Sequence, residues 1–369
     1  MQSMNKNKFS RELLHNVNTL SSADAKSFFI SSSNFDKTKT FLVENKFPFK
    51  PYRFAKCFLV NCVYSDLEKF ANLEEVELIH SNSHVLAYGA EHNFINLPKL
   101  TEGKYLGKDV NICFIDTGIY PHFDFIFPYS RIVKFVDLIN GKTLPYDDNG
   151  HGTFVCGVAC GGGVYSKQNI GIAPLANIIS IKALKQDGSS NSNTILDAMQ
   201  WIYENHRVFN ISIVCMSFGA DSTENSPLSK GAEALWNLGI TVIAAAGNSG
   251  PKNNTIKSPG INPKIITVGA FDSFRFKTAN FSSRGPTKFG FKPDFLAPAV
   301  DLISCNNKII PYTKMSGTSV ASPLVAGICA IIKSKYKKAT NSEIKKFLIE
   351  NCKPVSNNKN DEGFGVLQF

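Results

Sequence analysis

The chain has 369 residues, 43% of them hydrophobic, and is therefore long enough to bury one large core or two smaller ones. No run approaches the roughly 18 consecutive apolar residues that a membrane span requires. Residues 1–20 are polar and lack the apolar core of a secretory signal, so we expect a cytoplasmic protein with no membrane partner. The net charge of +10 comes from scattered lysines without a nucleic-acid-binding motif, so we expect no nucleic-acid partner.

Nine cysteines are present, and several, such as Cys113 and Cys329, lie inside apolar runs. Cysteines in such runs usually behave as small buried hydrophobes, which together with the missing signal indicates a reducing compartment. Cys156 and Cys160 lie four apart on a predicted helix and could share a face as metal ligands. No second pair of ligands stands near them in the sequence, so we predict no metal site.

Residues 1–88 differ from the rest of the chain in their pattern of predicted secondary structure. Strand-like runs at 26–31, 55–64 and 76–79 surround a short helix at 66–72, for which Ser65 is the predicted N-cap. These elements predict a small α+β domain. A connector that contains Gly, Asn and Pro follows it to about residue 105.

From about residue 105 to residue 369, apolar strands alternate with helices. Uninterrupted apolar strands separated by helices are typical of a parallel sheet that is covered on both faces. We therefore predict an α/β fold with a doubly wound, mostly parallel sheet, and we expect functional residues at the carboxyl ends of its strands. The predicted strands are 110–115, 177–184, 210–218, 240–247 and 264–270, and the predicted helices are 151–160, 193–206, 227–238, 319–334 and 341–351.

Four polar residues stand at the ends of these strands or at the starts of these helices. Asp116 and Asn248 each follow a predicted strand, whereas His151 and Ser319 each begin a predicted helix. Taken alone, each has an ordinary role as a turn or cap residue. Taken together, they supply what acyl transfer needs: a hydroxyl nucleophile, a base, a carboxylate that orients the base, and an amide that stabilises the oxyanion.

Three motifs carry a resemblance to a known family. They read Asp116-Thr-Gly, His151-Gly-Thr and Gly317-Thr-Ser-Val-Ala-Ser-Pro323, in that order. Together with the segments at 145–153, 245–251 and 281–287, they make residues 105–369 similar to the subtilisin-like serine proteases, or subtilases. The resemblance is closest to the cytosolic AprX-type subtilases of bacilli.

The resemblance implies a catalytic triad of Asp116, His151 and Ser319, with Asn248 as the oxyanion donor. It implies peptide or protein substrates and no cofactor for catalysis. The substrate backbone would lie between two segments, and a broad apolar slot would hold the side chain before the scissile bond. The first segment is Gly188, Ser189 and Ser190, the second is Ser217, Phe218 and Gly219, and the slot lies between the second segment and Ala245, Ala246 and Gly247.

Residues 1–88 resemble the inhibitory prodomain of the family. This implies that the protease cuts itself after Tyr88 and that its own prodomain acts as an intramolecular inhibitor; the alternative is a permanent N-terminal domain that is never cut. The loop at 161–169 lacks the carboxylate and amide pattern of the family's calcium loop, so a structural calcium is left open. Ser258-Pro259 resembles a family position with a cis peptide bond.

Two other functions are compatible with the motifs. A pseudoprotease would keep the fold as a regulatory binding protein, but such relatives lose triad residues, and this chain has all four catalytic residues. A dedicated protease for one peptide precursor would use the same chemistry as a general one, and the sequence does not separate the two.

Overall fold

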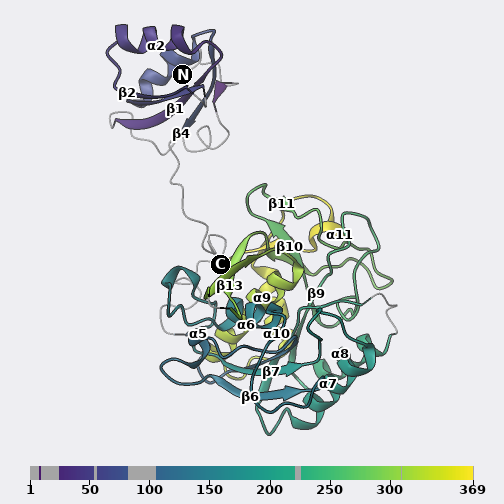
Figure 1. The fold of residues 1–369 in the computed structure, drawn as a ribbon. Coiled ribbons are helices and arrows are strands. Elements are labelled where there is room, and N and C mark those ends of the chain that lie inside the picture. Colours follow the sequence, from purple (N-terminus) through teal and green to yellow (C-terminus); the bar gives the residue numbers. More distant parts are fainter. Residues whose placement is uncertain are drawn as a thin grey trace. The chain divides into compact units, whose positions relative to one another are not determined.

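The computed structural model describes residues 8–9, 25–53, 56–81, 105–220, 226–308 and 310–368. The chain forms two compact units, residues 1–87 and 88–369 (Figure 1). Each has its own hydrophobic core. The predicted connector between residues 88 and 105 and the predicted cleavage site at Tyr88 lie outside the described residues.

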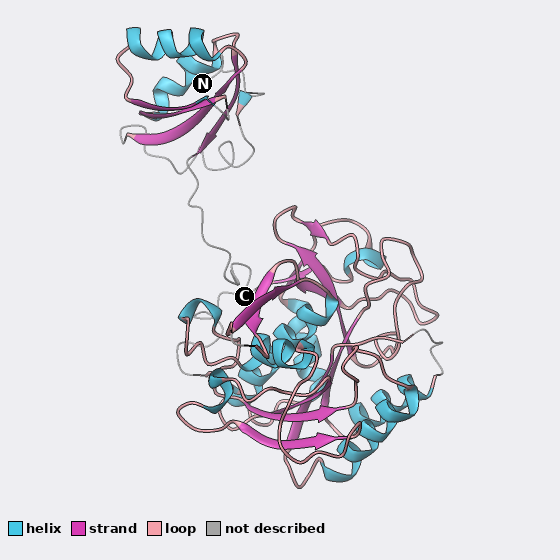
Figure 2. Ribbon diagram, viewed as in Figure 1, coloured by secondary structure: helices cyan, strands magenta, loops and turns pink. Residues whose placement is uncertain are grey.

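The described residues of the N-terminal unit form a four-stranded antiparallel sheet that packs with the helices α2 and α3 (Figure 2). The strands follow the order β2-β3-β1-β4, and Leu42, Phe58 and Phe70 from helices and sheet share one buried core. The predicted α+β arrangement is present. Its elements are β1 (Lys26–Ser32), α2 (Phe35–Glu44), β2 (Phe49–Tyr52), β3 (Cys57–Cys62), α3 (Leu67–Ala71) and β4 (Val76–Ser81).

Three details of this unit differ from the prediction, which did not include the strand β2. Ser65 does not cap α3, because the chain already turns as a 3-10 helix, η4 (Tyr64–Asp66), and Asp66 stands at the cap position without a side-chain capping bond. Helix α2 was not predicted, because it buries only Thr38 and Leu42 and so shows little apolar periodicity. The side chain of Asn34 caps it by accepting the backbone N–H of Lys37 at 3.1 Å.

The second unit is built on a ten-stranded sheet in the order β15-β16-β12-β10-β9-β8-β5-β7-β6, with β11 paired to β10. The strands from β12 to β6 in this order run parallel, and every residue of β9 and β10 is buried. Burial on both faces explains why these strands read as uninterrupted apolar runs. The strands are β5 (Asn111–Asp116), β6 (Ile132–Asp137), β7 (Asn177–Lys182), β8 (Ile211–Met216), β9 (Thr241–Ala245), β10 (Ile266–Asp272), β11 (Lys277–Thr278), β12 (Phe295–Pro298), β15 (Cys352–Lys353) and β16 (Val366–Leu367).

Helices cover the two faces of this sheet, which confirms the predicted doubly wound α/β fold (Figure 2). Helix α6 (His151–Cys160) packs against α9 (Thr318–Lys335), and α7 (Ser192–Asn205) packs against α8 (Pro227–Asn237). The other helices among the described residues of this unit are α5 (Phe123–Ile126), η5 (Lys167–Asn169), α10 (Asn341–Glu350) and α11 (Lys359–Glu362). Among the helices that the structure describes, none is both long and apolar enough to cross a bilayer.

Several short strands were not predicted. β6 alternates between buried and partly exposed positions at the edge of the sheet, with Lys134 near its middle. β12 has only four residues and ends at Pro298. A separate two-stranded hairpin is formed by β13 (Leu302–Cys305) and β14 (Tyr312–Met315). Short or edge strands carry too few residues for a clear apolar pattern.

Candidate active site

The predicted carboxylate and the predicted base are in direct contact. Asp116 ends β5 and is buried, and His151 begins α6 with its side chain 26% exposed. The Nδ1 atom of His151 lies 2.7 Å from Asp116 Oδ1, which also accepts the backbone N–H of Thr117 at 2.7 Å. A ring nitrogen that bonds a carboxylate carries the proton, so Nε2 is left as the basic nitrogen.

Electrostatics at the ring favour its protonated form. Burial lowers the pKa of His151, but the charge of Asp116, its hydrogen bond and the charge of Asp147 together outweigh burial, so the pKa lies above its ordinary value. Asp116 Oδ2 is buried and accepts no hydrogen bond from the described residues, so His151 and the Thr117 N–H are the donors that the structure gives this carboxylate. The imidazolium that forms when a base accepts a proton is therefore stabilised in place.

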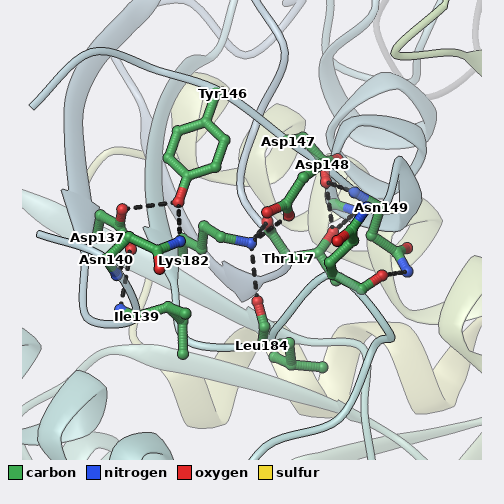
Figure 3. Close-up of polar contacts among 12 residues, drawn as sticks. Thr117, Asp137, Ile139, Asn140, Tyr146, Asp147, Asp148, Asn149, Lys182 and Leu184 are labelled. Atoms are coloured by element: carbon green, nitrogen blue, oxygen red, sulfur yellow. Dashed lines mark hydrogen bonds and ion pairs between the residues drawn. The ribbon is translucent and has the colours of Figure 1, made fainter. Parts of the chain in front are cut away.

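Asp147 ties the loop that carries Asp116 to the helix that carries His151 (Figure 3). Its Oδ1 atom accepts the hydroxyl of Thr117 at 2.9 Å, and its Oδ2 atom accepts the backbone N–H of Thr153 at 2.9 Å. Asp147 is buried. The sequence prediction missed this residue; the available signal was an acidic residue in a turn directly before the Gly-His-Gly motif.

Gly152 allows the two catalytic loops to approach each other. A Cβ atom at this position would collide with the carbonyl oxygen of Gly118 and would lie 3.2 Å from Asp116 Cβ. Only a residue without a Cβ atom fits at this position, so Gly152 is required for the close backbone approach beside His151.

Lys182 supports the Asp116 loop from the neighbouring strand, where it pairs with Asp116 (Figure 3). It ends β7 and its side chain is fully buried. The ammonium donates hydrogen bonds to the carbonyl oxygens of Thr117 at 2.7 Å and Leu184 at 3.0 Å, and to Asp148 Oδ1 at 2.6 Å. A buried ammonium with three oxygen partners holds its surroundings in one arrangement. The sequence signal for it was a lysine inside an otherwise apolar strand.

Ser319 and Asn248 border one small space above Gly317. A Cβ atom on Gly317 would lie 3.1 Å from Ser319 Oγ and 3.2 Å from Asn248 Nδ2. The other end of the Asn248 amide is anchored, because Oδ1 accepts both the backbone N–H and the hydroxyl of Thr318 at 2.9 Å. The amide nitrogen is therefore held toward the space beside Ser319 Oγ. Thr318, which sets this orientation, was not singled out from the sequence.

Ser319 is the second residue of α9, a helix that is buried along most of its length. The first N–H groups of a helix have no partner within the helix, and the helix dipole favours negative charge there. Because Thr318 N is taken by Asn248 and Val320 N by the carbonyl of Gly317, the N–H of Ser319 is the one placed beside the hydroxyl oxygen. A tetrahedral oxyanion could receive hydrogen bonds from this N–H and from Asn248.

The predicted substrate segments follow the carboxyl ends of three strands. Residues 188–190 lie in an exposed turn after β7, where Asn149, beside His151, donates to the carbonyl of Gln186 at 2.7 Å. Residues 217–219 follow β8, and residues 245–247 end the neighbouring strand β9 or follow it. All three segments thus lie at the sheet edge that carries Asp116.

Three buried residues outside this site have the right types for a metal centre. The ligand atoms of His122, Asp124 and Cys305 lie within 4.8 Å of one another. The Asp124 carboxylate already accepts the backbone N–H groups of Gly163 at 2.9 Å and Val164 at 3.0 Å. These backbone N–H groups satisfy the Asp124 carboxylate, and the cluster therefore anchors the 161–169 loop by hydrogen bonds.

The nine cysteines are all free thiols. Cys156 and Cys160 are fully buried on α6, and burial raises the pKa of Cys160 to about 12 and that of Cys156 well above its ordinary value. A thiol that keeps its proton is a poor metal ligand and a poor nucleophile. These two residues are packed in the hydrophobic core.

Residues 107–366 match the model of the subtilase family. The chain is 38% identical over 317 residues to serine protease AprX of Bacillus subtilis (strain 168), covering 78% of this chain and 71% of that protein. It is 33% identical over 258 residues to subtilisin DY of Bacillus licheniformis, covering 68% and 86%. A crystal structure of a cold adapted subtilisin-like serine proteinase superposes with a TM-score of 0.59 at 26% identity, covering 72% of this chain and 89% of that one. The chain belongs to the subtilase family and is a subtilisin-type serine protease.

Proposed function

We propose that the chain is an active endopeptidase in which Asp116, His151 and Ser319 act as one catalytic unit through an acyl-enzyme. The observation that carries the proposal is the 2.7 Å contact between Asp116 and His151, at the same sheet edge as a serine hydroxyl and an anchored amide that share one space. This is the set of groups that peptide hydrolysis by a serine hydroxyl requires.

Each group has one task in the proposed reaction. His151 Nε2 takes the hydroxyl proton as Ser319 Oγ forms a bond to the substrate carbonyl carbon. Asn248 Nδ2 and the Ser319 N–H donate to the resulting oxyanion. The oxyanion collapses, the C–N bond breaks, and His151 gives its proton to the leaving amine. Water then attacks the ester by the same route and releases the acid and the free Ser319 hydroxyl.

The substrate backbone would extend between residues 188–190 and 217–219, and the slot between 217–219 and 245–247 would take one side chain. That side chain belongs to the acyl residue, the substrate residue on the carbonyl side of the scissile bond. Backbone pairing of this kind accepts many sequences, so specificity depends on the slot. Peptides and unfolded proteins are the proposed substrates.

The proposal includes self-processing between residues 84 and 100, with Tyr88 as the predicted site, and inhibition by the released N-terminal unit. It is supported by the separate core of that unit, which a cut after residue 84 would leave whole. A cytoplasmic location is also proposed, supported by nine free thiols that a reducing compartment would preserve.

Intact-mass analysis and peptide hydrolysis of the same purified samples test the proposal. We expect the wild type to lose an N-terminal fragment that ends between residues 84 and 100 and to hydrolyse casein and short peptides. Ser319→Ala should stay whole, with turnover lower by about 10⁶-fold, the loss known for the same residue of subtilisin. Ser316→Ala is the matched control, because this exposed hydroxyl instead accepts the Asp301 N–H at 2.8 Å. Comparable hydrolysis by Ser319→Ala and wild type would overturn the assignment.

A further inference from the structure

The slot for the acyl residue has a third side that the sequence did not predict. Its two walls, residues 217–220 and 245–248, are joined by the segment at 257–260. Lys257 N donates to the carbonyl of Ala246 at 2.9 Å, and Ser258 pairs with Ala220 through bonds of 3.0 and 2.9 Å. The following Ser258–Pro259 peptide bond is cis, as predicted. Residues 257 and 258 therefore connect one wall of the slot to the other.

The side chain of Lys257 lies between the glycines of the two walls. A Cβ atom on Gly219 would lie 2.6 Å from Lys257 Cβ, and a Cβ atom on Gly247 would lie 2.5 Å from Lys257 Cγ. Neither separation leaves room for a methyl group, so both glycines are needed to admit the lysine stem. The lysine stem therefore fills part of the slot, which is narrower than the broad apolar slot expected from the small residues of its two walls.

Lys257 also gives the slot a charge. Within residues 217–220, 245–248 and 257–260, all of which the structure describes, it is the only residue with an ionisable side chain. The other side chains of these segments are small, apolar or uncharged. Lys257 is half-buried, so its charge is less screened than that of a fully exposed lysine.

We infer that Lys257 makes this protease select an acidic acyl residue, glutamate above all, over neutral and aromatic residues. The inference rests on the proposed function. The methylene groups of glutamate would lie along the lysine stem and the glycine walls, and its carboxylate would meet the ammonium. A charge-assisted bond in a partly dry slot discriminates strongly against a substrate that lacks the charge. A tyrosine ring would compete with the lysine stem for the same space, so this inference favours Glu91 over Tyr88 as the site of self-processing within residues 84–100.

Lys257 already has an interaction partner in the free protein. An incoming carboxylate would share or replace that partner, so the gain in binding free energy is smaller than for a lysine without one. We therefore expect a preference of about tenfold or more, rather than an absolute requirement.

The test uses four peptides that differ only in the acyl residue: glutamate, glutamine, alanine or tyrosine. Glutamate and glutamine have nearly the same shape, so the ratio of their kcat/KM values isolates the charge. We expect this ratio to exceed about 10 in the wild type and to fall to one or below in Lys257→Met, which keeps most of the stem. Lys257→Gly should raise hydrolysis of the tyrosine peptide relative to the alanine peptide.

Lys252→Met is the matched control, because it removes the same charge from an exposed position in the same loop. It should keep the wild-type ratio of glutamate to glutamine. A wild-type ratio of one or less would overturn the inference without any variant, and so would an unchanged ratio in Lys257→Met. If Lys257→Met does not fold, Lys257→Gln replaces it, with the same expected ratio.

The inference and the proposed function fail in different ways. Cleavage of the alanine peptide that depends on Ser319, without preference for glutamate, would overturn only the role of Lys257. If the wild type cleaves none of the four peptides and Ser319 does not react with a serine-directed phosphonate, both would be overturned.

Discussion

The Oδ2 atom of Asp147 accepts two hydrogen bonds from Thr153, one from its backbone N–H at 2.9 Å and one from its hydroxyl at 2.7 Å. Asp147 precedes His151 in the chain and Thr153 follows it, so these bonds fix the start of α6 on both sides of the imidazole. Through Oδ1 and Thr117, the same carboxylate also holds the loop that begins at Asp116. Asp147 is therefore a positioning residue for the Asp116–His151 pair.

Asp147→Asn should lower kcat/KM by about 10- to 100-fold, because an amide cannot accept all of these bonds and the catalytic pair loosens. It should also move the acid limb of the pH profile to lower pH. The base must be neutral to act, so this limb follows the pKa of His151, and removing a negative charge that raises this pKa lowers it. The measurement is kcat/KM from about pH 5 to 9.

The control for that prediction is Asp197→Asn, which removes one carboxylate from an exposed position on α7. Its acid limb should coincide with that of the wild type. An acid limb in Asp147→Asn that also coincides with the wild type would show that Asp147 has no electrostatic effect on the base.

The hydroxyl of Thr318 should matter for turnover although it does not touch the substrate. It donates to Asn248 Oδ1 at 2.9 Å and accepts the backbone N–H of Gly247 at 3.1 Å. Asn248→Ala should lower kcat by about 10² to 10³-fold, as expected for an oxyanion donor. Thr318→Val keeps the side-chain amide of Asn248 but removes one of the bonds that orient it. We expect it to lower kcat by about tenfold with little change in KM.

Thr318→Ser keeps the hydroxyl and should restore most of the lost turnover. Steady-state kinetics of the valine and serine variants therefore separate positioning from packing. Equal losses in the two variants would mean that the threonine methyl group, and not the hydrogen bond to Asn248, accounts for the effect.

Lys182→Met should destabilise the protein and disturb the Asp116 loop together. The substitution leaves the carbonyl oxygens of Thr117 and Leu184 without their buried donor and separates Asp148 from its partner. We expect the free energy of unfolding to fall by about 3 kcal/mol. Urea unfolding measures it, with Lys142→Met as the control, since that exposed lysine should change the stability by less than about 1 kcal/mol. Equal stability of the two variants would contradict a structural role for Lys182.

Much of the peptidase fold follows from local patterns. β9 and β10 are buried on both faces, and such strands must be apolar throughout, so their position could be predicted from the sequence. Helix α9 is long and apolar and begins at a Gly-Thr-Ser motif, which located it equally well. β6 and α2 escaped prediction because a half-buried edge strand and a mostly exposed helix leave weak apolar periodicity.

The residues of the candidate site also differ in how far the sequence could predict them. Asp116, His151, Asn248 and Ser319 could be named from the sequence because each stands in a short motif at a strand end or helix start, where the residue type and its neighbours carry the signal. Their catalytic roles remain predictions that the Ser319→Ala experiment tests. Asp147 and Lys182, which hold these groups in place, lie outside the three motifs, and Thr318 lies inside one of them although its bond to Asn248 could not be predicted from the sequence.

The sequence by itself determined the alternation of strands and helices, the family motifs and the order in which the catalytic residues occur. Only the tertiary structure decided that Asp147 and Lys182 hold the catalytic loop and that Lys257 lies between Gly219 and Gly247. The physical reason is that apolar periodicity and motifs are properties of neighbouring residues. The bonds of a buried ammonium and the filling of a slot depend on atoms from segments that are distant in the sequence. The packing of the whole sheet decides which of these segments come into contact.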